Sequence, residues 1–320
     1  MRYIRNVCAI LCRVMLAGIV SSSASAEPPI IEHLEFETNL ARHVKPVKIT
    51  ATLYLPIVSS PAPAMVIISS SGGVIDWNEG YYARELSKQG IAALVVDSFK
   101  PRGIRDIVEK QLSVTSWHME NDAFAALAEL QKDKRIDPSR IGIMGISKGG
   151  IVAQNSAFLI RRGARGTGTL AFAAHVPIAP DCAGQFRDAK TTGKPIFYML
   201  AELDDADPHQ PCLDYIHRIN VAGNPHAAAK VYKGAHHNWE RTKPLIYLAK
   251  AQNGSKCTSL IEDNGDRTFA AGNVYVKDGD VGAWMTKNCY FLGEHVGGGT
   301  DKLKRQATDD LLAFLRSSGF

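Results

Sequence analysis

The chain has 320 residues and a formal charge of +5, from 37 Lys and Arg residues against 32 Asp and Glu residues. Three of the arginines lie in the first 26 residues, and without them 34 basic residues face 32 acidic ones, a formal charge of +2. The remaining basic residues form no stripe along the sequence, which excludes nucleic acid as an expected partner.

The first 26 residues have the layout of a secretory signal peptide. Arg2 and Arg5 give a positive start, residues 7–20 are largely apolar, and Ala24-Ser25-Ala26 places small residues before Glu27. The apolar stretch is too short and too interrupted for a transmembrane helix, which needs about 20 apolar residues. We therefore expect a mature chain of residues 27–320 without a stable membrane anchor, in the periplasm or secreted.

Four cysteines follow this leader: Cys182, Cys212, Cys257 and Cys289. An even number of cysteines in an exported chain favours disulfides, and four cysteines allow three pairings. The most economical pairing joins sequence neighbours, Cys182 with Cys212 and Cys257 with Cys289. None of the four has the C-x-x-C spacing of a zinc knuckle or a redox motif.

Strand patterns and helical patterns alternate along the mature chain. In chain order, we expect a half-buried edge strand at 48–56, a central strand at 64–68, an amphipathic helix at 78–89, a buried strand at 91–96, a helix at 117–132, a turn at Asp137-Pro138, a strand at 141–146, a helix at 148–161, strands at 170–177, 195–200 and 229–232, and a final helix at 301–317. This alternation predicts an α/β fold with a mostly parallel central sheet covered by helices on both faces.

Residues 251–300 are the exception, because they are rich in Gly, Asn, Asp and Lys and show no sustained period. A long irregular segment is usually functional or disordered, and a disulfide across it would favour an ordered lid. A structural or partner-binding role is the alternative. We expect one domain over residues 27–320, with 251–300 as an irregular insertion.

The most informative motif follows the strand at 141–146, where Gly145-Ile146-Ser147-Lys148-Gly149 has the pattern Gly-x-Ser-x-Gly. A strand that enters a helix through one tight turn exposes the middle side chain at the top of the sheet, and only small flanking residues tolerate the crowding. A loop that merely caps the helix is the alternative. The strand, the motif and the helix together favour Ser147 as a nucleophile.

A serine nucleophile needs a base, and the base needs an acid that orients it. On this fold the order along the chain is Ser, then acid, then His. Asp204, Asp205 and Asp207 follow the strand at 195–200, and two histidines follow the strand at 229–232. Both groups lie at the carboxyl ends of strands, where open α/β sheets place their sites.

One of His236 and His237 is the expected general base, and the other lines the site or packs. Solvated loop acids and zinc ligation by these histidines are the competing interpretations. Zinc ligation would leave the motif at Ser147 unexplained, so we expect no metal and no cofactor.

These residues resemble the dienelactone hydrolase family of the α/β-hydrolases over roughly residues 48–240. The resemblance rests on four pieces of sequence: Val95-Val96-Asp97-Ser98-Phe99-Lys100-Pro101-Arg102-Gly103, Gly145-Ile146-Ser147-Lys148-Gly149-Gly150, Glu202-Leu203-Asp204-Asp205 and Gly234-Ala235-His236-His237-Asn238-Trp239. It implies the α/β-hydrolase fold and a serine-using, often exported branch. The acid of the family corresponds to Asp204, with Asp205 as the alternative, and its histidine corresponds to His237.

The chain departs from the family pattern at four places. Ala201 stands in place of the usual Gly before the acid, Ser69-Ser70 in place of His-Gly, and Trp239 in place of Phe. Ser147 replaces the cysteine of the better-known cytosolic members.

The oxyanion hole of this fold takes one N–H from the residue after the nucleophile and one from the loop after the first central strand. These correspond to Lys148 and Ser71, and the side chain of Lys148 is expected to face solvent. The sequence thus predicts an exported hydrolase that cleaves a small-molecule carboxylic ester or lactone through an acyl-enzyme. A peptidase or acyltransferase on the same triad, and a non-catalytic binding protein that retains the pocket, are the alternatives.

Overall fold

A computed structural model describes residues 28–38, 46–161 and 169–320 of the chain. The predicted signal peptide lies outside these residues. None of the helices in the three described ranges combines the length and the apolar character that a membrane-spanning segment requires.

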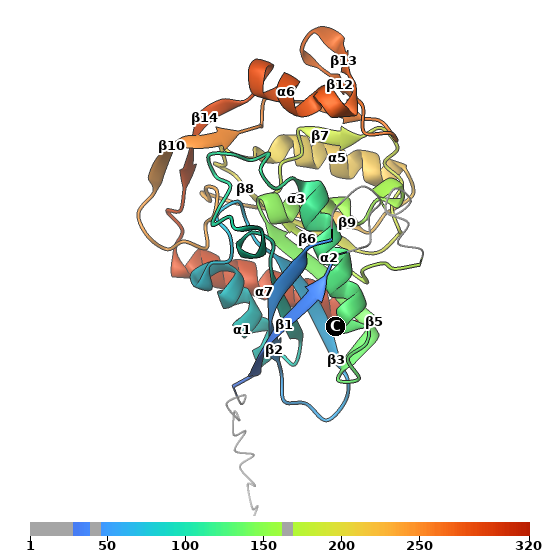
Figure 1. Ribbon diagram of the computed structural model, residues 1–320. Coiled ribbons are helices and arrows are strands. Elements are labelled where there is room, and N and C mark those ends of the chain that lie inside the picture. The colour runs from blue at the N-terminus through green and yellow to red at the C-terminus, as the bar shows by residue number, and fades with distance from the viewer. Residues whose placement is uncertain (1–27, 39–45, 162–168) are drawn as a thin grey trace, which may run out of the picture.

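An eight-stranded sheet runs through the centre of the molecule, in the spatial order β1-β2-β4-β3-β5-β6-β8-β9 (Figure 1). Its strands are β1 (Ile30–Glu37), β2 (Lys48–Leu55), β3 (Ala62–Ile68), β4 (Ala92–Asp97), β5 (Ile136–Ile146), β6 (His175–Ile178), β8 (Ile196–Ala201) and β9 (Ala227–Tyr232). β2 is antiparallel to both of its neighbours, and the strands from β4 to β9 are parallel. The mostly parallel sheet predicted from the sequence is confirmed.

Helices cover both faces of this sheet, which explains why β3 and β4 are buried along their whole length. On one face lie α1 (Tyr81–Lys88) and α7 (Asp301–Ser317), and on the other lie α2 (Ser116–Leu130), α3 (Lys148–Asn155) and α5 (His209–Val221). Short helical turns complete this part of the chain at η1 (Asp76–Gly80) and η2 (Lys100–Arg102).

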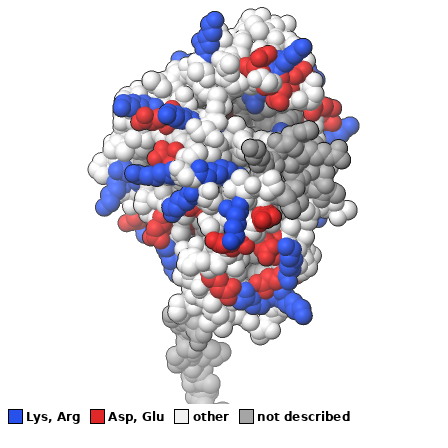
Figure 2. Space-filling view, in the orientation of Figure 1, with Lys and Arg blue, Asp and Glu red and all other residues white. Residues whose placement is uncertain are grey.

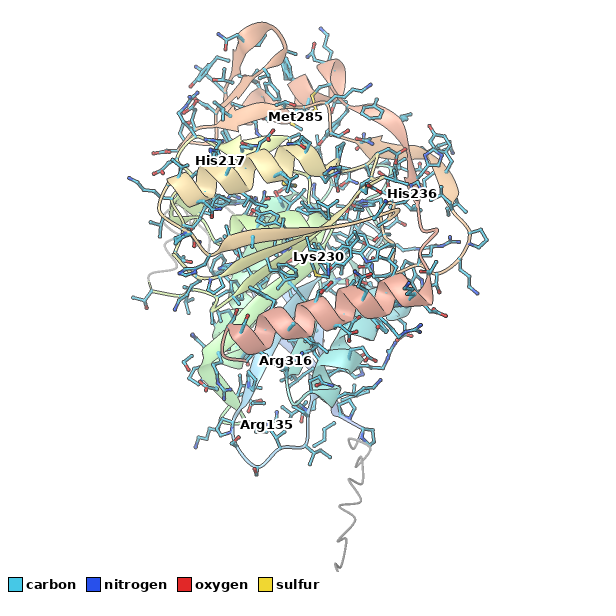
Figure 3. All side chains as sticks on the ribbon, turned by 180° about the vertical axis from the view of Figure 1, so that it is seen from behind. Arg135, His217, Lys230, His236, Met285 and Arg316 are labelled. Carbon is cyan, nitrogen blue, oxygen red and sulfur yellow. A yellow bond between two sulfur atoms is a disulfide. The ribbon has the colours of Figure 1, made fainter. Side chains whose placement is uncertain are left out.

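The view from behind shows α7 crossing the sheet beneath Lys230 of β9 (Figure 3). The Lys230 Nζ atom lies 2.7 Å from Asp310 Oδ2 of α7. The last helix of the chain is therefore attached to the last strand of the sheet, in addition to its apolar packing through Leu311 and Leu315.

The structure corrects three details of the sequence-based prediction. The edge strand is β1, which pairs with β2 along its full length, so β2 is an inner strand. Asp137-Pro138 lies within β5, because the pairing with β3 is irregular between Ile136 and Ile141 and lets Pro138 bulge out without an N–H to donate. α3 ends at Asn155, since Phe158 pairs with Thr191 instead of continuing the helix.

The segment expected to be irregular, 251–300, contains regular elements. They are β10 (Ile246–Asn253), β11 (Ser259–Ile261), β12 (Arg267–Phe269), η3 (Ala271–Asn273), β13 (Val274–Val276), α6 (Asp278–Asn288) and β14 (Phe291–Val296). β10 pairs with β14, and β11–β13 form a second small sheet with β7 (Gly184–Phe186). β11, β12 and β13 have three residues each, which is too short to show a period in the sequence.

Two disulfides are present among the described residues, one within residues 251–300 and one that ends in α5, just after the loop of Asp204. Cys182 is bonded to Cys212 and Cys257 to Cys289. The pairing of sequence neighbours is thus confirmed. The second bond connects the residues just after β10 to the residues just before β14, and so closes the base of the segment.

Lys and Arg side chains are interspersed with Asp and Glu on the face of the molecule seen in Figure 2. Among the described residues of that face, no continuous area of one sign is visible. This face therefore offers no extended basic surface to a phosphate backbone.

Candidate active site

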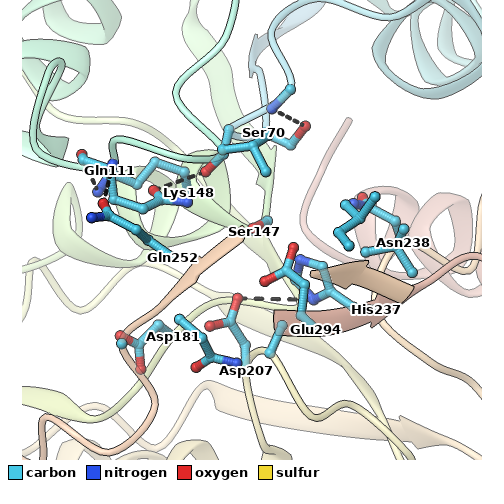
Figure 4. A pocket seen from close by; sticks show the side chains of 18 of the residues that line it. Ser70, Gln111, Ser147, Lys148, Asp181, Asp207, His237, Asn238, Gln252 and Glu294 are labelled. Atoms are coloured by element: carbon cyan, nitrogen blue, oxygen red, sulfur yellow. Dashed lines mark hydrogen bonds and ion pairs between the residues drawn. The ribbon is translucent and has the colours of Figure 1, made fainter. Parts of the chain in front are cut away.

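Ser147 occupies the turn between β5 and α3, as the Gly-x-Ser-x-Gly pattern predicts. Its backbone has φ 55° and ψ −116°, a combination that side-chain-bearing residues rarely adopt. The turn brings the Ser147 side chain into the lining of a cavity at the carboxyl edge of the sheet. In Figure 4, Ser147 lies between Lys148 on one side and His237 on the other.

Gly145 and Gly149 make this turn possible, because backbone atoms lie where their side chains would otherwise be. A Cβ atom on Gly145 would lie 2.2 Å from the carbonyl oxygen of Gly149, and one on Gly149 would lie 2.2 Å from the carbonyl oxygen of Ile68. Both separations are far inside van der Waals contact. The turn therefore depends on glycine at these two positions for its close approach to β3.

His237 and Asp204 lie on neighbouring loops, after β9 and after β8. The His237 Nδ1 atom is 2.8 Å from Asp204 Oδ2, and both side chains are buried. The other carboxylate oxygen of Asp204 accepts the backbone N–H groups of Ala206 at 3.0 Å and Asp207 at 2.8 Å. The acid is thereby fixed by three hydrogen bonds and aimed at the histidine.

The sequence left two alternatives open at these loops, and the geometry separates them. Asp205 is exposed and faces His295, with 2.7 Å between Asp205 Oδ2 and His295 Nδ1. His237 lines the cavity, whereas His236 does not. The histidine that lines the cavity with Ser147 is therefore His237, and the carboxylate bonded to it is that of Asp204.

The charge around His237 favours its protonated form. Burial is the largest single effect and would lower the pKa of this imidazole, but the adjacent Asp204 carboxylate, together with Asp207 and Glu294, outweighs it. The Asp207 Oδ2 atom lies 3.9 Å from His237 Nδ1. The net effect is a pKa for His237 raised above the ordinary histidine value of 6.5.

The cavity has a volume of about 260 Å³ and is lined by both polar and apolar side chains. Three carboxyl groups, those of Asp181, Asp207 and Glu294, project toward it in Figure 4. Burial raises the pKa of all three. The sequence predicts Asp207 only as a loop acid and does not single out Asp181 or Glu294. Glu294 comes from β14, which returns to the cavity more than 50 residues beyond His237 in the chain.

The side chain of Lys148 does not face solvent, contrary to expectation. It lines the cavity, and its Nζ atom donates to the backbone carbonyl of Gln111 at 3.3 Å. Burial lowers the pKa of this amino group to about 8, against the opposing effect of Asp181 and Asp207. A residue at the first position of a helix can direct its side chain along either side of the turn, so the sequence pattern did not determine this direction.

The backbone N–H groups of Ser71 and Lys148 have no hydrogen-bond acceptor among the residues that the structure describes. Both residues line the cavity beside Ser147. The Ser71 side chain donates to Gln111 Oε1 at 3.0 Å, and its carbonyl accepts the Ile107 N–H at 2.8 Å. Backbone N–H groups at a helix N-terminus and on a neighbouring loop are the kind of donors that bind a negatively charged oxygen.

No group of three or more potential metal ligands occurs within residues 28–38, 46–161 and 169–320. Asp204 and His237 instead bond each other.

Comparison with known protein families matches residues 49–259 of this chain to the dienelactone hydrolase family. The chain belongs to this family. The matched range of this dienelactone hydrolase family member runs from β2 to the start of β11 and contains Ser147, Asp204 and His237. Strand β14 and helix α7 lie beyond it. A comparison with curated proteins finds no match.

Solved structures similar to this family member are α/β hydrolases. An esterase from Pyrobaculum calidifontis shares 18% identity at a TM-score of 0.50, covering 67% of this chain and 78% of the esterase. An acylaminoacyl peptidase in complex with a chloromethyl ketone shares 16% identity at a TM-score of 0.50, covering 66% of this chain and 38% of the peptidase. At these identities the likeness shows the α/β-hydrolase fold.

Substituting Gly149→Ala tests the close approach of the turn to β3. We expect the free energy of unfolding to fall by about 1–3 kcal/mol, as for other overpacked sites, because the new methyl group would collide with the Ile68 carbonyl. Denaturant unfolding measures this. Gly279→Ala in α6 is the matched control, since a Cβ there meets no atom within 4 Å. Equal stability of the two variants would contradict the steric argument.

Proposed function

We propose that this dienelactone hydrolase family member is an exported serine hydrolase that cleaves a small-molecule carboxylic ester or lactone. The observation that carries the proposal is the 2.8 Å contact between His237 and Asp204, with His237 and Ser147 lining one cavity. In this proposal Ser147 is the nucleophile, His237 the general base, and Asp204 the acid that orients it.

The reaction proceeds in two halves. The second ring nitrogen of His237 takes the Ser147 proton as the hydroxyl oxygen attacks the substrate carbonyl, and the same proton then passes to the leaving alkoxide. This step leaves an acyl group on Ser147. In the second half, His237 removes a proton from water, the hydroxide attacks the acyl carbon, and the proton returns to Ser147 as the carboxylic acid leaves.

The developing oxyanion is bound by the N–H groups of Ser71 and Lys148. Their free donors and their position at the cavity support this role. Loss of one such donor costs about 10²–10³ in kcat in known hydrolases. The positive end of α3 adds to the stabilisation.

Export is supported by the two disulfides, since such bonds persist in oxidising compartments and are rare in the cytosol. The first 26 residues fit the layout of a secretory leader. We therefore propose a periplasmic or secreted location for the mature chain.

Hydrolysis of p-nitrophenyl esters of increasing acyl length tests the proposed reaction, with Ser147→Ala alongside. We expect short acyl chains to react fastest, because a long chain in this cavity would remove water from the carboxyl groups of Asp181, Asp207 and Glu294. We expect no measurable turnover in Ser147→Ala. Undiminished turnover in that variant would refute the mechanism, and labelling by a fluorophosphonate would separate an active serine from a silent pocket.

Replacing Asp204 tests the orienting acid, and the chain provides a matched control next to it. Asp204→Asn should lower kcat by roughly 10⁴, as the same change does in other triads, because the amide cannot hold the correct histidine tautomer. Asp205→Asn removes an exposed carboxylate that faces His295, so its kcat should stay within a few-fold of the wild-type value. Equal losses of kcat in the two variants would show that the assignment of Asp204 as the orienting acid is wrong.

The pH profile of kcat/KM tests the environment of His237. A protonated imidazole cannot accept the Ser147 proton, so activity is lost as the pH falls through the pKa of His237. Because this pKa is raised, the acidic limb should lie above pH 6.5. Glu294→Gln removes one of the charges that raise it and should move the limb to lower pH, whereas Glu262→Gln, in the surface pair with Arg187, should leave it in place. A limb below pH 6.5 would count against this electrostatic account.

A further inference from the structure

The loop that carries Ser71 is held at both ends by one carboxylate. Glu79 Oε1 accepts the backbone N–H of Ser70 at 3.1 Å, and Glu79 Oε2 accepts the backbone N–H of Ile75 at 2.8 Å. Ser70 is seen at the edge of the cavity in Figure 4. The two bonds bracket the loop on either side of Ser71 and Gly72.

Burying the carboxyl group of Glu79 at this position costs free energy. Its side chain is completely buried, and no Lys, Arg or His of the described ranges lies within ion-pair distance of it. Burial raises the pKa of this carboxyl to about 7, partly offset by the two backbone bonds and reinforced by the nearby Glu240. A buried charge without a cation is retained only where its hydrogen bonds compensate.

Helix capping explains only half of this arrangement. The bond from Ile75 to Glu79 closes the first turn of η1, as a capping glutamate does. The bond to Ser70 lies nine residues back in the chain and satisfies no donor of the helix. It ties the far end of the loop to the same carboxylate.

Further hydrogen bonds hold the loop between these two anchors. Gly73 N–H donates to the Ser70 carbonyl at 3.1 Å, with Gly73 at φ 81°. The Ser71 carbonyl and side chain are also bonded, to Ile107 and Gln111. The Ser71 N–H remains free among the described residues. The Val74 N–H also lacks an acceptor there, but Val74 does not line the cavity, so the Ser71 N–H is the free donor of this loop at the cavity.

We infer that Glu79 is a positioning residue, which fixes the 70–75 loop so that the Ser71 N–H is preorganised for the oxyanion. This inference rests on the proposed function and deepens it. The neighbouring Asn78 points the other way and donates to Asn238 Oδ1 at 3.5 Å, on the loop of His237. The turn η1 thus contacts both the oxyanion loop and the histidine loop.

Glu79→Gln tests this role. Its NH₂ group would face one of the two backbone N–H donors, so one anchor is lost. We expect kcat for a p-nitrophenyl ester to fall at least about 10-fold, within the 10²–10³-fold limit for losing a whole donor, with KM changed less than about 3-fold. The affinity for phenylboronic acid, whose adduct with serine is tetrahedral, should fall by a similar factor to kcat.

Glu240→Gln is the matched control. Glu240 is equally buried, but its carboxylate accepts the Tyr82 hydroxyl and contacts no amide of the loop. We expect its kcat and its boronic acid affinity to stay within about 3-fold of the wild-type values. Equal losses of kcat and boronic acid affinity in both variants, or wild-type values in a folded Glu79→Gln, would overturn the inference.

Amide hydrogen exchange in the wild-type protein provides a test that needs no variant to fold. The Ser70 and Ile75 amides should be strongly protected, while the Ser71 amide should exchange fast. Similar exchange at all three positions would contradict the two hydrogen bonds to Glu79.

If the wild type and Ser147→Ala hydrolyse esters equally, the proposed function fails. If turnover depends on Ser147 but Glu79→Gln matches the wild type, only this inference fails.

Discussion

Ser147 holds a backbone conformation that costs of order 1–3 kcal/mol, and the packing around it leaves no alternative. Gly149 brings the β5–α3 turn against the Ile68 carbonyl at the end of β3, and Gly145 lets the turn close on Gly149 itself. The strand on which the turn rests also leads into the loop of Ser71. One close contact between backbones therefore places the Ser147 turn beside the strand that leads to Ser71, the two positions where we propose the nucleophile and an oxyanion donor.

Carboxyl groups do different work in this site according to what they touch. Asp204 is fixed by two backbone N–H groups and by His237, so in the proposed mechanism its charge favours the imidazolium that would form when Ser147 loses its proton. Glu79 touches only backbone and acts on the loop. Asp207 and Glu294 face the cavity, where burial raises their pKa. In the proposed mechanism one functional group thus serves as an orienting acid, a loop anchor and a pocket wall, and its hydrogen-bond partners distinguish these roles.

The sequence predicted those parts of the molecule that local patterns determine. Apolar runs predicted β3, β4 and β8, and the chain order of Ser147, Asp204 and His237 predicted loops that meet at one edge of the sheet. β1 was missed because its alternation is carried by residues that are mostly half-exposed, such as Glu32 and Leu34. Glu79 and Glu294 were missed for another reason. Their roles depend on contacts across the fold, with Ser70 and with the cavity, which no spacing along the chain records.

Strands β10 and β14 supply much of the cavity wall, and the Cys257–Cys289 bond closes their base. The family match includes β10 but ends before β14. The proposed chemical machinery therefore lies inside the shared region, whereas three residues of the cavity wall, Tyr290, Glu294 and Val296, lie outside it. Changes at these three positions would alter the cavity without touching the proposed triad, so family membership constrains the proposed reaction more closely than the shape of its substrate.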